Sequence, residues 1–227
     1  MYKRQSQVPL YVNDPVAVTA EGTPVRIVRN AETNLGDLCA DAYRALSNAD
    51  IAFVNGGGIR KQIEAGDITL DDIYSVHPFG NTMCVIRVTG QQVLDALEWG
   101  ARAVPSENGG FLQVSGLTYE IHTGVASSAE KDENGMFTRV SGEYRVKNVM
   151  VGGQPLELDK TYTLASHNYM LLGHGDGYTM FDGCEVLGED MMVDNQVLIT
   201  YITTTLGGVV GEQYANPYGD GRIVAVE

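Results

Sequence analysis

The fold is decided by one stretch, Ile51-Ala-Phe-Val-Asn-Gly-Gly-Gly-Ile-Arg60. Its first four residues are apolar and include Phe and β-branched side chains, a pattern typical of a short buried strand. The apolar run stops at Asn55, and the three glycines that follow allow a tight turn and a close approach of backbone to a ligand. With Asn55 before the glycines and Arg60 after them, the stretch has two interpretations: a binding site at a strand end, or an ordinary tight loop.

Apolar residues at helical spacing predict three main helices, at residues 34–48, 90–103 and 194–206. Thr33 or Asn34 is a suitable N-cap for the first helix. Thr69 with Asp72, and Thr89 with Gln92, have the spacing of capping boxes that open a short helix and the second main helix.

Runs with strand-like patterns lie between these helices, at residues 16–20, 51–54, 83–88, 117–122, 144–149, 159–166 and 221–226. The chain has no internal repeat and no linker that would split it. We therefore expect an α+β fold, a single domain built on a mixed β-sheet with flanking helices. The domain is expected to cover residues 16–227, with residues 1–15 as a lead-in or linker.

Length, charge and cysteine content limit the class of protein. The 227 residues suffice to bury a hydrophobic core, and the formal net charge of −14 argues against nonspecific binding to a nucleic-acid polymer or an anionic membrane. No apolar run is long enough to span a bilayer. The N-terminal residues lack the apolar core of a signal peptide, so we expect either an intracellular chain or a leader removed upstream. Three widely spaced cysteines are expected to be buried free thiols.

Two turns combine an aromatic residue with glycines and polar groups. In the first, Phe79 lies between Pro78 and Gly80. An aromatic side chain at a turn tip either fills the core or stands in a cleft as a stacking platform. In the second, Tyr169 precedes a glycine-rich loop that contains Asp176. Together the two turns suggest a slot for a flat ring.

Polar residues around these turns supply the remaining groups that a nucleoside requires. Asp176 is suited to accept hydrogen bonds from vicinal hydroxyls. Asn55 and Asn81 are suited to read ring edges, because an amide both donates and accepts. Arg29 and Arg60 are suited to an anionic or polyhydroxyl group; the alternative for Arg29 is solvated surface charge.

The chain resembles the C-terminal domain of the secreted 5′-nucleotidase family, which includes UDP-sugar hydrolases and 2′,3′-cyclic-nucleotide phosphodiesterases. The resemblance runs from about residue 16 to residue 223, and six markers in the right order carry it. These are Glu32-Thr-Asn-Leu-Gly-Asp37, Asn55-Gly-Gly-Gly-Ile-Arg60, Pro78-Phe-Gly-Asn81, Phe111-Leu-Gln-Val-Ser-Gly116, Lys160-Thr-Tyr162 and Gly175-Asp-Gly-Tyr178.

The resemblance implies a substrate-binding role for eight residues: Arg29, Asn55, Gly58, Arg60, Phe79, Asn81, Tyr169 and Asp176. The two aromatic rings should sandwich the base, the two arginines and Asp176 should hold the ribose or adjoining phosphate, and Asn55 should lie at the base or sugar. Arg26 is the alternative to Arg29. The chain departs from the family pattern at His174, where the family commonly has glycine, and has one residue more between Tyr169 and Asp176.

The same resemblance indicates what lies outside this chain. Family enzymes carry an N-terminal metallophosphoesterase domain with two divalent metal ions and a His/Asp pair, which activate water and clamp phosphate. This chain has four histidines and neither an Asp-x-His nor a Gly-Asn-His-Glu motif. We therefore expect no catalytic residue, no metal ligand and no cofactor in it. His77 has no other histidine at metal-ligand spacing, so we expect a structural role for it.

The expected partners are a nucleoside or nucleotide and the N-terminal metallophosphoesterase domain of the same parent chain. The resemblance implies an extracellular, cell-surface or periplasmic parent protein. A stand-alone nucleoside-binding or surface interaction module without catalysis is the alternative, and the full-length reading frame would decide between them. Catalysis by an acid/base pair within the chain has little support, because no two carboxylates stand in an obviously shared site.

Overall fold

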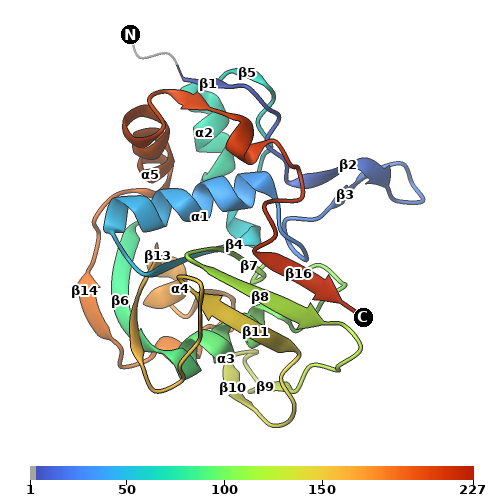
Figure 1. Cartoon of the computed structure of the whole chain (residues 1–227), viewed down its shortest axis with the longest axis vertical. Helices are drawn as coiled ribbons and strands as arrows, with labels where there is room; N and C mark the ends of the chain where they lie inside the picture. Colours follow the sequence, from blue (N-terminus) through green and yellow to red (C-terminus); the bar gives the residue numbers. More distant parts are fainter. Residues whose placement is uncertain (1–3) are drawn as a thin grey trace.

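Strand β4 (Ile51–Asn55) lies inside a five-stranded mixed sheet of the computed structural model, which describes residues 4–227 (Figure 1). The strand order is β14 (Glu185–Gly188), β6 (Met83–Thr89), β13 (Thr161–His167), β4 and β7 (Leu112–Ser115). β4 runs parallel to β13, and the other neighbouring pairs are antiparallel. All residues of β4 are buried, as its apolar run predicts.

Alternation along β4 divides the hydrophobic core between the two faces of this sheet. Ala52 and Val54 belong to one cluster of buried side chains, and Ile51 and Phe53 belong to the other. The first cluster includes residues of α1 (Asn34–Ser47), α2 (Leu70–Val76) and α5 (Asp194–Thr200), and the second includes residues of α3 (Gly90–Ala101). Because both clusters pack on one sheet, the chain forms the single α+β domain that the sequence predicts.

The other strands form a second sheet and three small ribbons. The second sheet has the order β12 (Gln154–Pro155), β11 (Val146–Val151), β8 (Leu117–His122) and β16 (Ile223–Val226). The ribbons are β15 (Val209–Val210) with β1 (Gln5–Ser6) and β5 (Gly66–Asp67), β2 (Asn13–Val18) with β3 (Pro24–Arg26), and β9 (Ala129–Lys131) with β10 (Phe137–Val140). Figure 1 shows the β2–β3 ribbon projecting from the body of the domain.

Local capping explains where the first helices start. The Thr33 hydroxyl accepts a hydrogen bond from the Gly36 N–H at 3.1 Å, and this caps α1. Both α2 and α3 open with the expected capping boxes. The helix predicted at 194–206 differs, since α5 ends at Thr200 and a π-helical turn, Tyr201–Thr205, follows. There Thr203 and Thr204 hydroxyls bond to carbonyls one turn earlier, which competes with regular helix geometry.

Several short elements have no periodic signal in the sequence. They are α4 (Asn168–Leu171) and the 3-10 turns Gly56–Gly58, Gly175–Gly177, Thr179–Phe181 and Glu212–Tyr214. Each is four residues or fewer, which is too short for helical spacing to be read. Within residues 4–227, no helix is long and apolar enough to cross a membrane.

The described part of the segment expected as a lead-in contributes to the core. Val8, Leu10 and Val12 are buried in the cluster that contains α1, and Leu10 forms a bridge with Ile63. The first three residues lie outside the described part of the chain.

Candidate functional site

Turns from distant parts of the chain meet at the end of β4 and enclose a cleft of about 330 Å³. The glycine turn supplies one wall, the turn after α2 supplies a second, and α4 with the following loop supplies a third. The cleft is lined by Arg29, Asn55, Gly57, Gly58, Phe79, Asn81, Gly109, Tyr169 and Asp176. Seven of the eight residues that the sequence singles out are therefore brought together.

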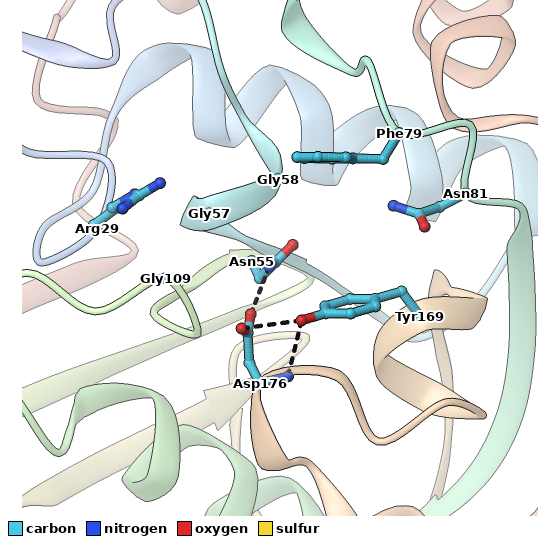
Figure 2. Close-up of a pocket in the computed structure, with 9 residues that line it drawn as sticks. All are labelled: Arg29, Asn55, Gly57, Gly58, Phe79, Asn81, Gly109, Tyr169 and Asp176. Carbon is cyan, nitrogen blue, oxygen red and sulfur yellow. Dashed lines mark hydrogen bonds between the residues drawn. The ribbon is translucent and has the colours of Figure 1, made fainter.

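The two aromatic rings face each other across this cleft (Figure 2). Phe79 is 60% exposed and Tyr169 is 44% exposed, which is unusual for side chains that gain so much from burial. Of the two interpretations of the Phe79 turn, the structure supports a ring that stands in a cleft. The Arg60 guanidinium lies 5.8 Å from the centre of the Phe79 ring, on the edge of the cleft.

Asp176 is held in an uncommon backbone conformation at the inner end of the cleft. Its φ is +54°, and the neighbouring His174 and Gly177 also have positive φ. Asp tolerates this region better than most residues, and Trp99, buried in the core, fixes the loop by donating from its indole N–H to the Asp176 carbonyl at 2.9 Å. A Cβ atom on Gly175 would lie 2.2 Å from the Tyr169 ring, so glycine is needed where the loop meets this ring.

Hydrogen bonds orient the Asp176 carboxylate within the cleft. Asn55 Nδ2 donates to Asp176 Oδ2 at 2.6 Å, and the Tyr169 hydroxyl donates to Asp176 Oδ1 at 3.3 Å. The Asp176 N–H donates back to the Tyr169 hydroxyl at 3.2 Å. The extra residue between Tyr169 and Asp176 therefore leaves the ring in contact with the loop (Figure 2). The arrangement can accept further hydrogen bonds from a ligand, because a carboxylate has about four lone-pair sites.

Two buried histidines lie beneath the glycine turn. His167 Nε2 is 2.9 Å from Asn55 Oδ1, and His77 Nδ1 is 3.3 Å from the Gly58 carbonyl oxygen. Burial lowers the pKa of His167 to about 3 and that of His77 to about 4, so both rings are neutral at physiological pH. The structure agrees with a structural role for His77. The sequence analysis did not predict the contact between His167 and Asn55. The one available indication was that His167 lies where a strand leads into the second glycine-rich loop.

Three arginines gather at the outer end of the cleft. Arg29 lines the cleft, whereas Arg60 lies at its edge and donates to the Gly57 carbonyl oxygen at 3.2 Å. Arg26 does not line it, and its guanidinium is 3.5 Å from the Ile59 carbonyl oxygen. Burial, with repulsion from Arg29 and Arg60, lowers the pKa of Arg26. The clustering makes this end of the cleft positive in a chain whose formal net charge is −14.

Gly57 and Gly109 complete the lining, and the sequence had not singled out either of them. The Gly57 N–H donates to the Gly109 carbonyl oxygen at 2.7 Å, and a Cβ on Gly57 would lie 2.9 Å from that same oxygen. The available signal for Gly109 was the glycine pair at 109–110, immediately before a strand.

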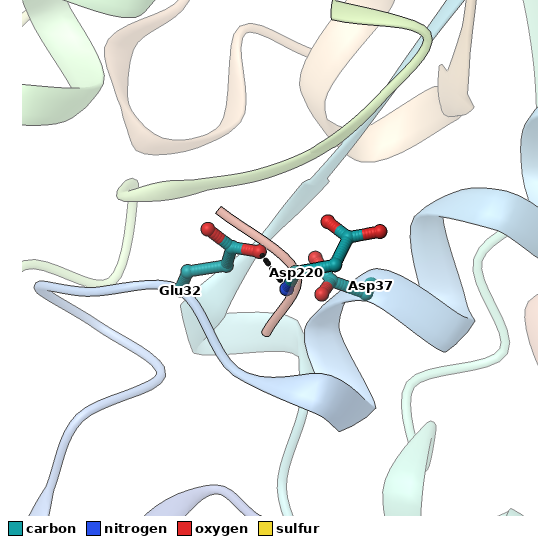
Figure 3. Close-up of side chains that lie close together, drawn as sticks. All are labelled: Glu32, Asp37 and Asp220. Atoms are coloured by element: carbon teal, nitrogen blue, oxygen red, sulfur yellow. Dashed lines mark hydrogen bonds between the residues drawn. The ribbon is translucent and has the colours of Figure 1, made fainter. Parts of the chain in front are cut away.

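Glu32, Asp37 and Asp220 form one group of carboxylates, within residues 4–227, close enough to share an ion (Figure 3). Glu32 already accepts hydrogen bonds from three backbone N–H groups of the segment 220–223, at 2.7, 3.0 and 2.7 Å. Arg222 Nε lies 3.6 Å from Asp37 and 2.8 Å from Asp220. Burial raises the pKa of Asp37 to about 9, against the lowering effect of Arg222. These residues tie the C-terminal segment to α1 and do not fit a two-metal centre.

The fold matches parts of longer nucleotidases. The match to the 5′-nucleotidase precursor from Thermus thermophilus covers 99% of this chain and 39% of that chain, with a TM-score of 0.77 and 30% sequence identity. The fold also matches the NAD nucleotidase of Haemophilus influenzae over 99% of this chain and 38% of that chain, with a TM-score of 0.67; at 20% identity this likeness concerns the fold alone. The chain thus has the fold of an α+β domain that, in these solved structures, forms one part of a longer protein.

Sequence comparison gives the family. The family described as "5'-nucleotidase, C-terminal domain" matches residues 15–183, and the chain belongs to this family. It is 36% identical over 88% of its length to a trifunctional nucleotide phosphoesterase of Bacillus subtilis, covering 13% of that protein. It is 34% identical over 78% of its length to the 5′-nucleotidase of Vibrio cholerae, covering 28% of it. The chain therefore spans a minor part of the relatives it matches.

Proposed function

We propose that this chain is the nucleoside-binding specificity domain of a metal-dependent 5′-nucleotidase-type phosphoester hydrolase. One observation carries the proposal: two exposed aromatic rings face each other across a cleft that ends in the oriented Asp176 carboxylate. In this proposal a planar base lies between Phe79 and Tyr169, and the ribose hydroxyls donate to Asp176. Family membership supports this interpretation.

The positive end of the cleft is suited to the phosphate. Arg29 lies in the cleft lining, Arg60 lies at the edge of the cleft beside Phe79, and Arg26 is close enough to both for their charges to lower its pKa. Guanidinium groups bind phosphate oxygens through charge-assisted hydrogen bonds. Asn55 is committed to Asp176 and His167, so Asn81 is the amide left to contact the base edge. The ligand then lies with its base between the rings and its phosphate towards the arginines.

Catalysis belongs, in this proposal, to an N-terminal metallophosphoesterase domain of the parent chain. Two divalent metal ions in that domain would activate water and bind the phosphate. The carboxylate cluster of Glu32, Asp37 and Asp220 does not fit such a centre, and the matched region makes up only 13% and 28% of two relatives. We place the parent protein outside the cytoplasm, in line with the secreted family that the sequence resembles.

Titration of adenosine and of AMP into the chain tests the proposal. Two stacked ring faces contribute on the order of 1–3 kcal/mol for each base, and a charge-assisted bond to Asp176 adds a comparable amount. Without the metal-containing domain, we expect a Kd of roughly millimolar to tens of micromolar. The NMR signals of Phe79 and Tyr169 should shift during the titration. A ligand-bound structure in which the base touches neither ring would overturn the proposal.

A further inference from the structure

The His167 ring occupies a fixed position directly beneath the cleft. It is 3% exposed, and its backbone is pinned on both sides. Before it, the Ser166 hydroxyl donates to the Phe53 carbonyl oxygen at 2.6 Å; after it, the Asn168 N–H donates to the Thr82 carbonyl oxygen at 2.8 Å. These bonds fix the backbone from which the imidazole projects towards Asn55.

Tyrosine rings pack around the same imidazole. Tyr43 contacts it edge-on at a centroid distance of 6.4 Å, and Tyr169 contacts it at 5.9 Å with a tilt of 41°. Tyr43 is itself 1% exposed and belongs to the core of the α1 face. The ring of His167 is thus held from the core side by Tyr43 and meets a wall of the cleft at Tyr169.

The polarity of the hydrogen bonds fixes which way the Asn55 amide faces. Asn55 Oδ1 can only accept, so His167 Nε2 carries the hydrogen of this 2.9 Å bond. With Oδ1 turned towards His167, Nδ2 is directed at the Asp176 carboxylate, 2.6 Å away. The flipped amide would set two acceptor oxygens, Asn55 Oδ1 and Asp176 Oδ2, against each other.

Gly58 leaves the space that this amide orientation needs. A Cβ atom on Gly58 would lie 2.6 Å from Asn55 Oδ1 and 3.9 Å from His167 Nε2. Any larger residue at this position would push the amide oxygen away from the imidazole. His167, Asp176 and Gly58, which come from separate elements, therefore all favour the same orientation of the Asn55 amide.

We propose that His167 is a positioning residue for ligand recognition, which holds Asn55 so that Asn55 orients the Asp176 carboxylate towards vicinal hydroxyls. Its consequence is specificity: His167 favours ribonucleosides over analogues without the 2′ and 3′ hydroxyls. This inference rests on the proposed function, because it concerns the same cleft. His167 does not itself touch the ligand, since Asn55 lies between His167 and the carboxylate.

The test compares adenosine with 2′,3′-dideoxyadenosine by isothermal titration calorimetry. In His167→Leu, the loss of the N–H donor frees the Asn55 amide to rotate. We expect adenosine affinity to fall about tenfold, the equivalent of one hydrogen bond, while dideoxyadenosine affinity changes less than about twofold. His167→Gln retains an N–H donor and should recover most of the preference for adenosine. A purely structural role would weaken both ligands by the same factor.

His77 offers a matched control, because it is also a buried neutral histidine beneath the cleft but bonds to the Gly58 backbone rather than to Asn55. His77→Gln should leave the ratio of the two affinities unchanged. If His167→Leu does not fold, Asn55→Ala replaces it, since that variant removes the group through which His167 acts. The adenosine preference should then fall by the same factor of about ten.

The outcomes separate the inference from the proposed function. If the unmodified chain binds neither nucleoside, the proposed function fails. If it prefers adenosine but His167→Leu weakens both ligands equally, or Asn55→Ala keeps the preference, the positioning role is wrong while the proposed function stands.

Discussion

Phe79 contributes to the cleft almost entirely through its ring, because its side chain is 60% exposed and adds little to the core. We expect Phe79→Ala to lower the affinity for adenosine by about 5- to 150-fold, as the loss of one stacking face of roughly 1–3 kcal/mol predicts. The melting temperature should change little. Calorimetric titration and a thermal melt of the same sample measure both quantities.

Tyr74 provides the control for this variant. It is an aromatic residue on α2 with 48% exposure, close to the Phe79 turn in sequence but outside the cleft lining. Tyr74→Ala should leave the adenosine affinity unchanged. Equal affinities for Phe79→Ala and the unmodified chain would contradict a stacking role for Phe79. Trp99 is unsuitable as a control, since its indole supports the Asp176 loop.

The loop after α4 acts as a unit, because its glycines set where Tyr169 and Asp176 lie. In Gly175→Ala, the new Cβ would meet the Tyr169 ring at 2.2 Å, and the ring must move because the backbone beneath it is fixed by Trp99. We expect adenosine binding to weaken at least as much as in a Tyr169→Ala variant, by about 5- to 150-fold. The partly exposed ring can turn into solvent, so the fold should persist.

Gly124→Ala is the matched control for the glycine substitution. Gly124 lies in another loop and has no positive φ. A Cβ atom at this position would lie 4.0 Å from its nearest neighbour, the backbone of Glu227. Titration of both variants with adenosine, with circular dichroism to verify folding, makes the comparison. Retained binding in Gly175→Ala would mean that Tyr169 does not form a wall of the cleft.

At the level of elements, the sequence predicts what local patterns encode. α1 and α3 follow their apolar spacing and caps, and β4 follows its apolar run. The π-helical turn after Thr200 depends on side-chain hydroxyls that compete for carbonyls, which spacing does not register. α4 is too short to show a period.

The candidate site was predictable where a residue type signals its chemistry. Exposed-turn aromatics, amides and a loop carboxylate could be selected from their neighbours in sequence, and seven of the eight selected residues line one cleft. Arg60 lies at its edge rather than in it, because its guanidinium turns towards Phe79 and the Gly57 carbonyl oxygen. The contact of His167 with Asn55 joins residues 112 positions apart, so no local pattern could show it.

The molecule as a whole is expected to need a second domain for chemistry. We predict that the purified chain releases no phosphate from AMP with Mn²⁺ or Zn²⁺ present. In the cluster of Glu32, Asp37 and Asp220, Glu32 is bonded to backbone N–H groups and Asp220 is paired with Arg222, so these carboxylates are not open to metal ions. A phosphate-release assay across column fractions measures this. Metal-dependent turnover that follows the protein peak and disappears in Asp176→Ala would contradict the prediction.

The contact between the C-terminal segment and α1 should make the stability of the domain depend on pH. Asp37 lies where the C-terminal segment meets α1, and burial raises its folded pKa to about 9 from an ordinary value of 3.8. The folded state therefore binds a proton that the unfolded state releases between these two values. The contribution of protonated Asp37 to the free energy of unfolding is complete below pH 4 and is lost as pH rises towards 9.

Asp37→Asn should remove this pH dependence, because the amide resembles the protonated carboxyl at every pH. Between pH 6 and pH 8.5, we expect the unmodified chain to lose roughly 1–3 kcal/mol of unfolding free energy more than Asp37→Asn loses. Urea unfolding at the two pH values gives the comparison. Asp41→Asn is the control: Asp41 is paired with Arg222 at 2.6 Å and has a lowered pKa, so this variant should be destabilised to a similar extent at both pH values. If Asp37→Asn and the unmodified chain lose the same free energy over this range, Asp37 is already ionised in the folded domain at pH 6, and Arg222 rather than a proton neutralises it.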